Sequence, residues 1–181
     1  MKKTIAFLYI LLAAIIIQSQ IPICHAQPYG AGLYNEDVPY GSETSLSIAT
    51  NGNVQISVTP TESGALATGQ NQVTVTSTDV VGYKLYIRSL NSTDMDNFGY
   101  NLPTSSNVAL APLDTNTWGY NTNGSSDFLG SSLSDILIKS TDGPVGEGEI
   151  TTVTYGIKVD MAKPAGYYTT SILYTAVPQT D

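Results

Sequence analysis

The chain has 181 residues, of which 15 are acidic and 7 are basic, so its formal net charge at pH 7 is −8. This charge argues against direct partners of the same sign, namely nucleic acid and anionic lipid. The single cysteine excludes an internal disulfide, and the length fits one packed domain.

Residues 1–26 have the parts of an export signal. Lys2 and Lys3 form a basic start, an apolar run covers residues 5–17, and Cys24-His25-Ala26 precedes the expected cleavage point. The apolar run is about 13 residues long, shorter than the roughly 20 needed to span a bilayer as an uncleaved anchor. We therefore predict cleavage after Ala26 and a secreted chain at the cell surface.

Cys24 leaves a second outcome open, in which the chain is lipidated and stays on a membrane. Lipoprotein signals have a small residue directly before the cysteine, whereas this chain has Ile23. The sequence therefore favours release after Ala26, with membrane attachment only in the lipidated form.

Cleavage after Ala26 would leave a chain with neither cysteine nor histidine. That chain keeps five basic and fifteen acidic residues, which gives a net charge of −10. Without these two residue types, a Ser–His–Asp or Cys–His catalytic site cannot be assembled, and the usual zinc ligands are missing. We therefore expect a protein that is not an enzyme.

Residues 27–44 predict an irregular leader, because Pro28, Gly30, Gly32 and Pro39 interrupt any regular pattern. Residues 45–59 then predict a β-hairpin. Leu46 and Ile48 alternate with small or polar residues, the segment 51–53 (Asn-Gly-Asn) favours a tight turn, and the alternation resumes over residues 54–58 before Pro60.

Two further strands are predicted at 73–78 and 83–88, joined by a turn at 79–82. The middle of the chain, residues 91–130, is polar and contains only short apolar pieces. Small strands are expected there at 108–110 and 117–120, within long loops of the kind that are usually functional or disordered. Trp118 and Phe128 argue against full disorder.

The C-terminal part returns to regular alternation. A strand at 136–138 is followed by a Gly-rich turn at 143–148, and Val153, Tyr155, Ile157 and Val159 share one face of the next strand. A turn at 163–166 leads to a last strand at 168–176.

No segment after the export signal has the spacing of a helix. The sequence predicts an all-β fold, an antiparallel β-sandwich of the immunoglobulin-like kind with about seven to nine strands. The expected domain covers residues 45–178, followed by a short tail at 179–181.

Three segments carry a resemblance to a known family: Gly82–Ile87, Asn116–Tyr120 and Thr151–Ala176. Their order resembles the WxL-type cell-surface domains of Gram-positive bacteria. The resemblance implies a sandwich fold and non-covalent attachment to the cell wall. Both Trp-x-Leu motifs are altered, since Trp118-Gly119-Tyr120 ends in tyrosine and Tyr174-Thr175-Ala176 has neither tryptophan nor leucine, so the chain resembles a distant relative.

A candidate ligand site lies around the only tryptophan. Aromatic rings beside amides and carboxylates are a common way to hold sugars, and this loop combines the two kinds of side chain: Trp118, Tyr120, Asn121, Asn123 and Asp127. The alternative, which is the more common arrangement, is that Trp118 fills one end of the core.

A candidate cation site lies in the segment 94–99. It begins like an acidic calcium loop, but Phe98 occupies a ligand position and Ser105 stands where a bidentate glutamate is required, which excludes an EF-hand. A looser Ca²⁺ site built from Asp94, Asp96 and Asn97 remains open beside the simpler reading of an Asx-rich turn. No other cofactor is expected.

These features predict a secreted, non-enzymatic protein of a bacterial surface that attaches non-covalently to cell-wall polysaccharide or peptidoglycan, or to a host glycan or protein. The alternative is a self-assembling subunit of a surface layer or fimbria, in which an open sheet edge accepts a neighbour's strand. A glycan hydrolase using two carboxylates, such as Asp94 with Asp96 or Glu147 with Glu149, comes third.

Overall fold

The computed structural model describes residues 45–78 and 80–179. The expected export signal, the leader at 27–44 and residues 180–181 lie outside the described residues. Every regular element within the described ranges is a β-strand, which confirms the all-β prediction. Over these same ranges, no helix has the length and hydropathy that crossing a bilayer requires.

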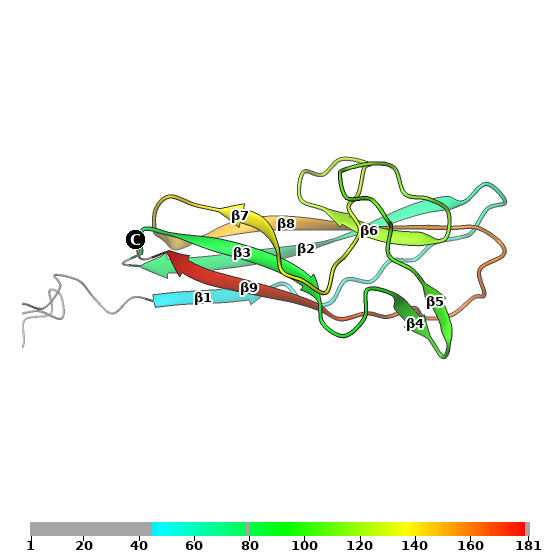
Figure 1. Ribbon diagram of the computed structural model, residues 1–181, viewed down its shortest axis with the longest axis horizontal. Helices are drawn as coiled ribbons and strands as arrows, with labels where there is room; N and C mark the ends of the chain where they lie inside the picture. The colour runs from blue at the N-terminus through cyan, green and yellow to red at the C-terminus, as the bar shows by residue number, and fades with distance from the viewer. Residues whose placement is uncertain (1–44, 79, 180–181) are drawn as a thin grey trace, which may run out of the picture. The chain divides into compact units, whose positions relative to one another are not determined.

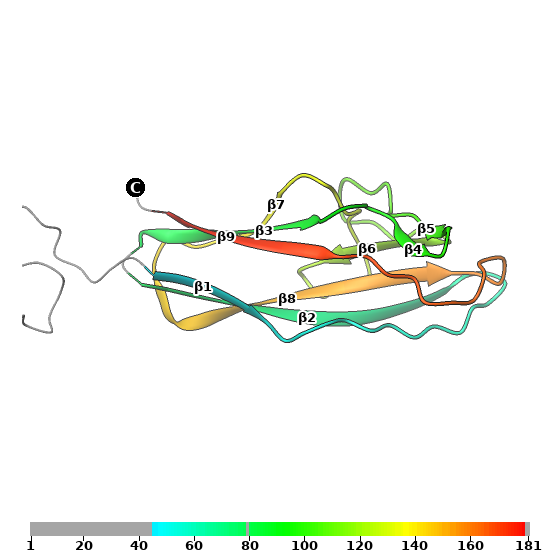
Figure 2. The same cartoon turned by 90° about the horizontal axis from the view of Figure 1, so that it is seen from below.

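Nine antiparallel strands form two larger sheets and one small hairpin. The four-stranded sheet has the order β1 (Ser45–Thr50), β2 (Ala65–Thr78), β8 (Val145–Val159), β6 (Thr117–Asn121). The three-stranded sheet has the order β7 (Ile136–Ser140), β3 (Gly82–Ser89), β9 (Ile172–Gln179). The hairpin pairs β4 (Met95–Asn97) with β5 (Tyr100–Leu102). The two larger sheets lie face to face (Figures 1 and 2).

The core fills the space between these two sheets, because the alternation along each strand turns one row of apolar side chains inward. Buried residues of the core come from both sheets: Val73, Val75, Trp118, Tyr120, Val153, Tyr155 and Val159 from the larger one, and Tyr83, Leu85 and Ile87 from the smaller. The inward faces predicted for β2, β3 and β8 are thereby confirmed.

The predicted hairpin over residues 45–59 is wrong. β1 pairs with β2, from Ser45 opposite Thr78 to Thr50 opposite Val73. Residues 51–60 then run beside β2 without forming a strand, and the side chains of Val54 and Ile56 cover Gly69. The alternation predicted which side chains face inward, but a period of two does not specify which strand receives the backbone hydrogen bonds.

One other predicted strand is absent, and two boundaries differ from the predictions. Residues 108–110 form no strand, and Val108 is 98% exposed. The Gly-rich turn is shorter than predicted, because β8 already begins at Val145 and pairs there with Ser77 across a register shift. The last strand begins at Ile172, and the residues before it run beside β4 instead.

Two short strands agree with the predictions to within two residues: β6, predicted at 117–120, covers 117–121, and β7, predicted at 136–138, covers 136–140. Asp79, within the predicted turn at 79–82, lies outside the described residues. β2 and β3 belong to different sheets, so the connection between them passes from one layer to the other.

Candidate functional site

The predicted sugar-binding rings lie inside the core. Trp118 has no exposed surface and Tyr120 is 2% exposed. The indole Nε1 of Trp118 donates a hydrogen bond to the carbonyl oxygen of Thr93, at 2.9 Å. Neither ring has an open face on which a sugar can stack, so both act as core residues, which is the alternative that the sequence had left open.

The polar residues of the same loop hold the loop itself together. The amide Nδ2 of Asn121 donates to the carbonyl oxygens of Ser125 and Asp127, at 3.0 and 2.8 Å. Its Oδ1 accepts from the N–H of Gly124, and Asn123 Oδ1 accepts from the N–H of Ser125. The structure uses the two asparagines to order the backbone of the loop.

The three residues predicted to bind a cation do not point to one place. Asp94 and Asp96 line one shallow depression of about 220 Å³ on the surface. Asn97 does not line it, because its side-chain amide lies against the backbone of Gly166. In the part of the chain that the structure describes, no three acidic, histidine or cysteine residues are grouped as metal ligands. A calcium site stays a prediction.

The wall of this depression belongs to a small sheet-like surface. The N–H of Asp96 donates to the carbonyl oxygen of Thr169 at 2.9 Å, and the N–H of Thr169 donates back to the carbonyl oxygen of Asp96 at 3.0 Å. This antiparallel bridge joins β4 to the segment before β9. It brings together two parts of the chain that are far apart in the sequence (Figures 1 and 2).

Side chains on either side of this bridge alternate between core and solvent. Met95 on β4 and Tyr168 on the partner segment pack against the core, so their neighbours in sequence turn outward. Phe98 lies in the turn between β4 and β5, two residues after Asp96, and Tyr167 lies two residues before Thr169. The outward-facing residues form a contact strip: Asp94, Asp96 and Phe98 on one side, and Tyr167, Thr169 and Ser171 on the other.

Two large aromatic rings occupy one end of the contact strip. Phe98 is 99% exposed and Tyr167 is 90% exposed. Phe98 also has a positive φ of 49°, a conformation that is rare for a bulky residue, and the N–H of Gly99 donates to Asp96 Oδ1 at 3.1 Å, which fixes the turn. A phenylalanine held in a strained turn and in water is a feature that packing does not explain, and it directs attention to binding.

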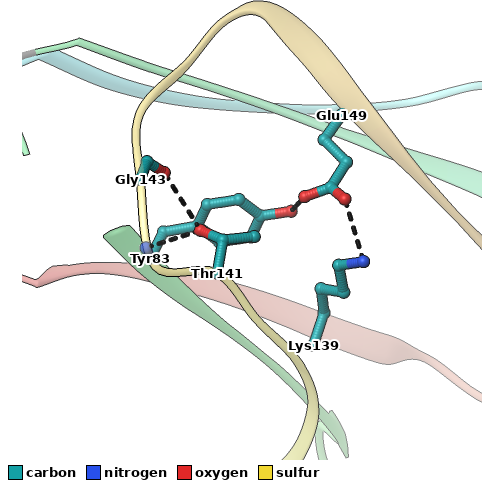
Figure 3. Close-up of polar contacts among 5 residues, drawn as sticks. All are labelled: Tyr83, Lys139, Thr141, Gly143 and Glu149. Carbon is teal, nitrogen blue, oxygen red and sulfur yellow. Dashed lines mark hydrogen bonds and ion pairs between the residues drawn. The ribbon is translucent and has the colours of Figure 1, made fainter. Parts of the chain in front are cut away.

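One member of the other carboxylate pair singled out in the sequence, Glu149, is part of a structural tie. Glu149 on β8 accepts a hydrogen bond from Tyr83 Oη at 2.7 Å and forms an ion pair with Lys139 Nζ at 2.8 Å (Figure 3). Lys139 holds the pKa of Glu149 below its ordinary value, although partial burial opposes this effect. Tyr83 and Lys139 belong to the smaller sheet, so the three residues connect the two layers.

The geometry defines an all-β protein of two facing antiparallel sheets with an aromatic contact strip beside its small hairpin. No family model, curated protein sequence or solved structure matches the chain. The resemblance to WxL-type surface domains therefore stays a prediction.

The sequence patterns did not single out either ring of the strip. Phe98 was considered only as a residue that interrupts a calcium loop, and Tyr167 falls between the predicted turn at 163–166 and the predicted strand at 168–176. Their common feature is exposure, a property that only the folded structure defines. The only local signal was a phenylalanine followed by glycine after Asp96-Asn97, which is typical of a turn tip.

Proposed function

We propose that this chain is a secreted, non-enzymatic binding module that attaches non-covalently to a glycan of a cell wall or host surface through the contact strip. The single observation that carries the proposal is the near-complete exposure of two aromatic rings, Phe98 and Tyr167, each two residues away from the backbone bridge between Asp96 and Thr169. Secretion rests on the export signal predicted in residues 1–26.

The chemistry of the strip suits a sugar. An exposed ring can cover the apolar C–H face of a pyranose, and water is released from both surfaces. Next to the rings, the carboxylates of Asp94 and Asp96 can accept hydrogen bonds from sugar hydroxyls, while the hydroxyls of Thr169 and Ser171 can donate or accept. Hydrogen bonds to carboxylates are the stronger ones.

The charge of the strip narrows the ligand class. The contact strip has two carboxylates and no basic side chain, and the whole chain has a net charge of −8. A negatively charged polysaccharide would be repelled, so we expect a neutral glycan or one that carries amino groups.

Binding of the purified chain to wall polysaccharide, peptidoglycan and a panel of host glycans tests the proposal. We expect Phe98→Ala and Tyr167→Ala each to weaken glycan binding by about tenfold or more, as is usual for central aromatic residues of an interface. Tyr167→Phe should retain most of the affinity, because it keeps the ring. Calorimetry with and without a chelator would also show whether Ca²⁺ takes part.

The matched control is Val108→Ala, which removes another fully exposed apolar side chain outside the strip and should leave the affinity unchanged. Unaltered glycan binding in both ring variants would remove the strip from the binding surface. Retention on a protein ligand, with no glycan bound, would replace the glycan by a protein partner.

A further inference from the structure

Four strands form the outer edges of the two larger sheets, and three of them are protected against further pairing. β6 is covered, because the backbone of Trp118 bonds with Pro103 and Ser105 and the backbone of Tyr120 bonds with Leu129. β7 carries Lys139 and β9 carries Pro178, and lysine and proline are residues that natural edge strands use against unwanted pairing.

Among the described residues, β1 has none of these protections. The stretch from Ser45 to Thr61, which contains β1 and the segment after it, holds no charged residue and has proline only at position 60. Its first part is paired with β2 on one side, and β1 is the outermost strand of its sheet. Such an edge presents a row of unpaired backbone groups to solvent.

The register between β1 and β2 identifies which backbone N–H and C=O groups of β1 point away from β2. The N–H of Asn51 donates to the carbonyl oxygen of Gln72, so residue 51 points its backbone groups toward β2. In an antiparallel strand the direction alternates from one residue to the next. Ser47 and Ala49 therefore also point toward β2, whereas Leu46, Ile48 and Thr50 point their N–H and C=O groups away from it.

The open edge continues beyond β1. Residues 53–59 form no backbone hydrogen bond with any other described residue. Their side chains still alternate, with Val54, Ile56 and Val58 half-buried and the residues between them exposed. An extended segment that is fixed by its apolar side chains, with its backbone groups unused, lengthens the surface on which another strand can pair.

We propose that this edge is an interface between two copies of the chain, in which β1 of one copy pairs antiparallel with β1 of the other. Identical strands in antiparallel register satisfy a two-fold axis, so each copy offers the same groups that it needs. The pairing would join the four-stranded sheets of the two copies into one continuous sheet and would close as a dimer rather than grow as a fibre.

Charge favours a second copy as the occupant of this edge. Two chains that each carry a net charge of −8 repel one another over most of their surfaces. The uncharged edge from Ser45 to Thr61 lets two copies approach without placing like charges in contact. This interface is separate from the contact strip and does not depend on the glycan proposal.

Sedimentation velocity of the purified chain over a range of concentrations, combined with amide hydrogen exchange, tests this dimer. We expect a monomer–dimer equilibrium. The N–H groups of Leu46, Ile48 and Thr50 should become protected as the concentration rises, while those of Ser47 and Ala49 should be protected at every concentration.

Two variants act on the interface by different means. Thr50→Pro removes one N–H that points to the open edge, where proline is tolerated in a strand, and Ser47→Lys adds an edge charge. Each should weaken dimerisation at least tenfold and keep a cooperative thermal transition. The matched control is Thr68→Lys on β2, which adds the same charge at an exposed position of an inner strand and should leave dimerisation unchanged.

A strict monomer at all concentrations would overturn the proposal, and so would a dimer that both edge variants leave intact. Concentration-independent protection of Leu46, Ile48 and Thr50 in a monomer would mean that the chain's own N-terminal residues occupy the edge, which also contradicts the dimer.

Discussion

The buried indole of Trp118 positions the contact strip from within the core. Its Nε1 is bonded to the carbonyl oxygen of Thr93, the residue directly before Asp94. A buried indole N–H left without an acceptor is costly, so this bond fixes where the segment before β4 meets the larger sheet. The only tryptophan therefore acts on the proposed site indirectly, through the backbone that carries Asp94, Asp96 and Phe98.

Glu149 shows how a single carboxylate can connect two layers. Tyr83 is fully buried, and its hydroxyl group has Glu149 as its acceptor (Figure 3). Lys139 pairs with the second oxygen of the same carboxylate. Because the tie depends on the ionised form of Glu149, it should weaken when that carboxylate takes up a proton.

We predict that this tie makes the protein less stable in acid. The pKa of Glu149 is lower in the folded chain than its ordinary value of 4.5, chiefly because of Lys139. The stabilisation is therefore complete above that value and is lost as the pH falls through the lower pKa of the folded state. Urea unfolding at pH 7 and pH 3 should show a smaller difference for Glu149→Gln than for the natural chain.

At pH 7 the Glu149→Gln change should lower the free energy of unfolding by about 0.5–1 kcal/mol, as expected for a partly exposed ion pair. Glu147→Gln is the control, because Glu147 lies in the same strand and is exposed. If both variants keep the acid sensitivity of the natural chain, the tie does not depend on the charge of Glu149.

Between elements, two glycines form a slot that receives an aromatic ring. Gly119 on β6 lies directly opposite Gly156 on β8. A Cβ added at Gly156 would lie 2.5 Å from ring atoms of Phe128, which is fully buried. The ring thus packs where the paired strands have no side chains, and this contact explains why the polar segment between Asn121 and Phe128 is ordered.

We predict that filling this slot destabilises the fold. Gly156→Ala should lower the free energy of unfolding by about 1–3 kcal/mol, the usual range for overpacking, because the ring of Phe128 must move. Gly146→Ala is the control in the same strand, since nothing lies within 4 Å of a Cβ added there. Thermal melting of both variants tests this prediction. Equal melting temperatures for Gly156→Ala and Gly146→Ala would contradict it.

Across the whole described molecule, buried tyrosine hydroxyls bridge the two sheets at two places. Tyr155 on β8 and Tyr174 on β9 share a hydrogen bond of 2.6 Å, and Tyr83 reaches Glu149. Burial raises the pKa of Tyr174 to about 12, and burial together with Tyr174 raises the pKa of Tyr155 still further. Tyr83 must keep its proton to donate to Glu149, and burial disfavours a charge on Tyr155 or Tyr174.

The protein should therefore unfold in alkali. A tyrosine whose pKa is raised by folding contributes stability that is complete below its ordinary value of 10 and is lost as the pH rises through the folded value. We expect the free energy of unfolding to fall between pH 10 and about 12. The ultraviolet absorbance of tyrosinate should rise together with the loss of structure.

The double variant Tyr155→Phe with Tyr174→Phe removes one bridge without leaving a hydroxyl unpaired. Its stability should depend less on pH above 10, whereas Tyr174→Phe alone should cost about 1–3 kcal/mol at pH 7, because the hydroxyl of Tyr155 loses its partner. Ordinary tyrosine titration in a protein that stays folded would show that the bridges do not control stability.

Residue order alone was sufficient for the properties that depend on local spacing. Apolar residues at every second position, such as Val73 and Val75, Tyr83 and Leu85, and Val153 and Tyr155, predicted both the all-β class and the inward faces, because successive side chains of a strand point to opposite sides. The composition likewise indicated which chemistry an exported chain would lack.

Only the tertiary structure decided which segments meet. It paired β1 with β2 instead of with residues 54–58, buried Trp118, and joined Asp96 to Thr169 in a backbone bridge. Each of these outcomes joins segments distant in sequence, and many pairings satisfy the same alternation. The choice among them comes from packing of the complete core, which no local pattern contains.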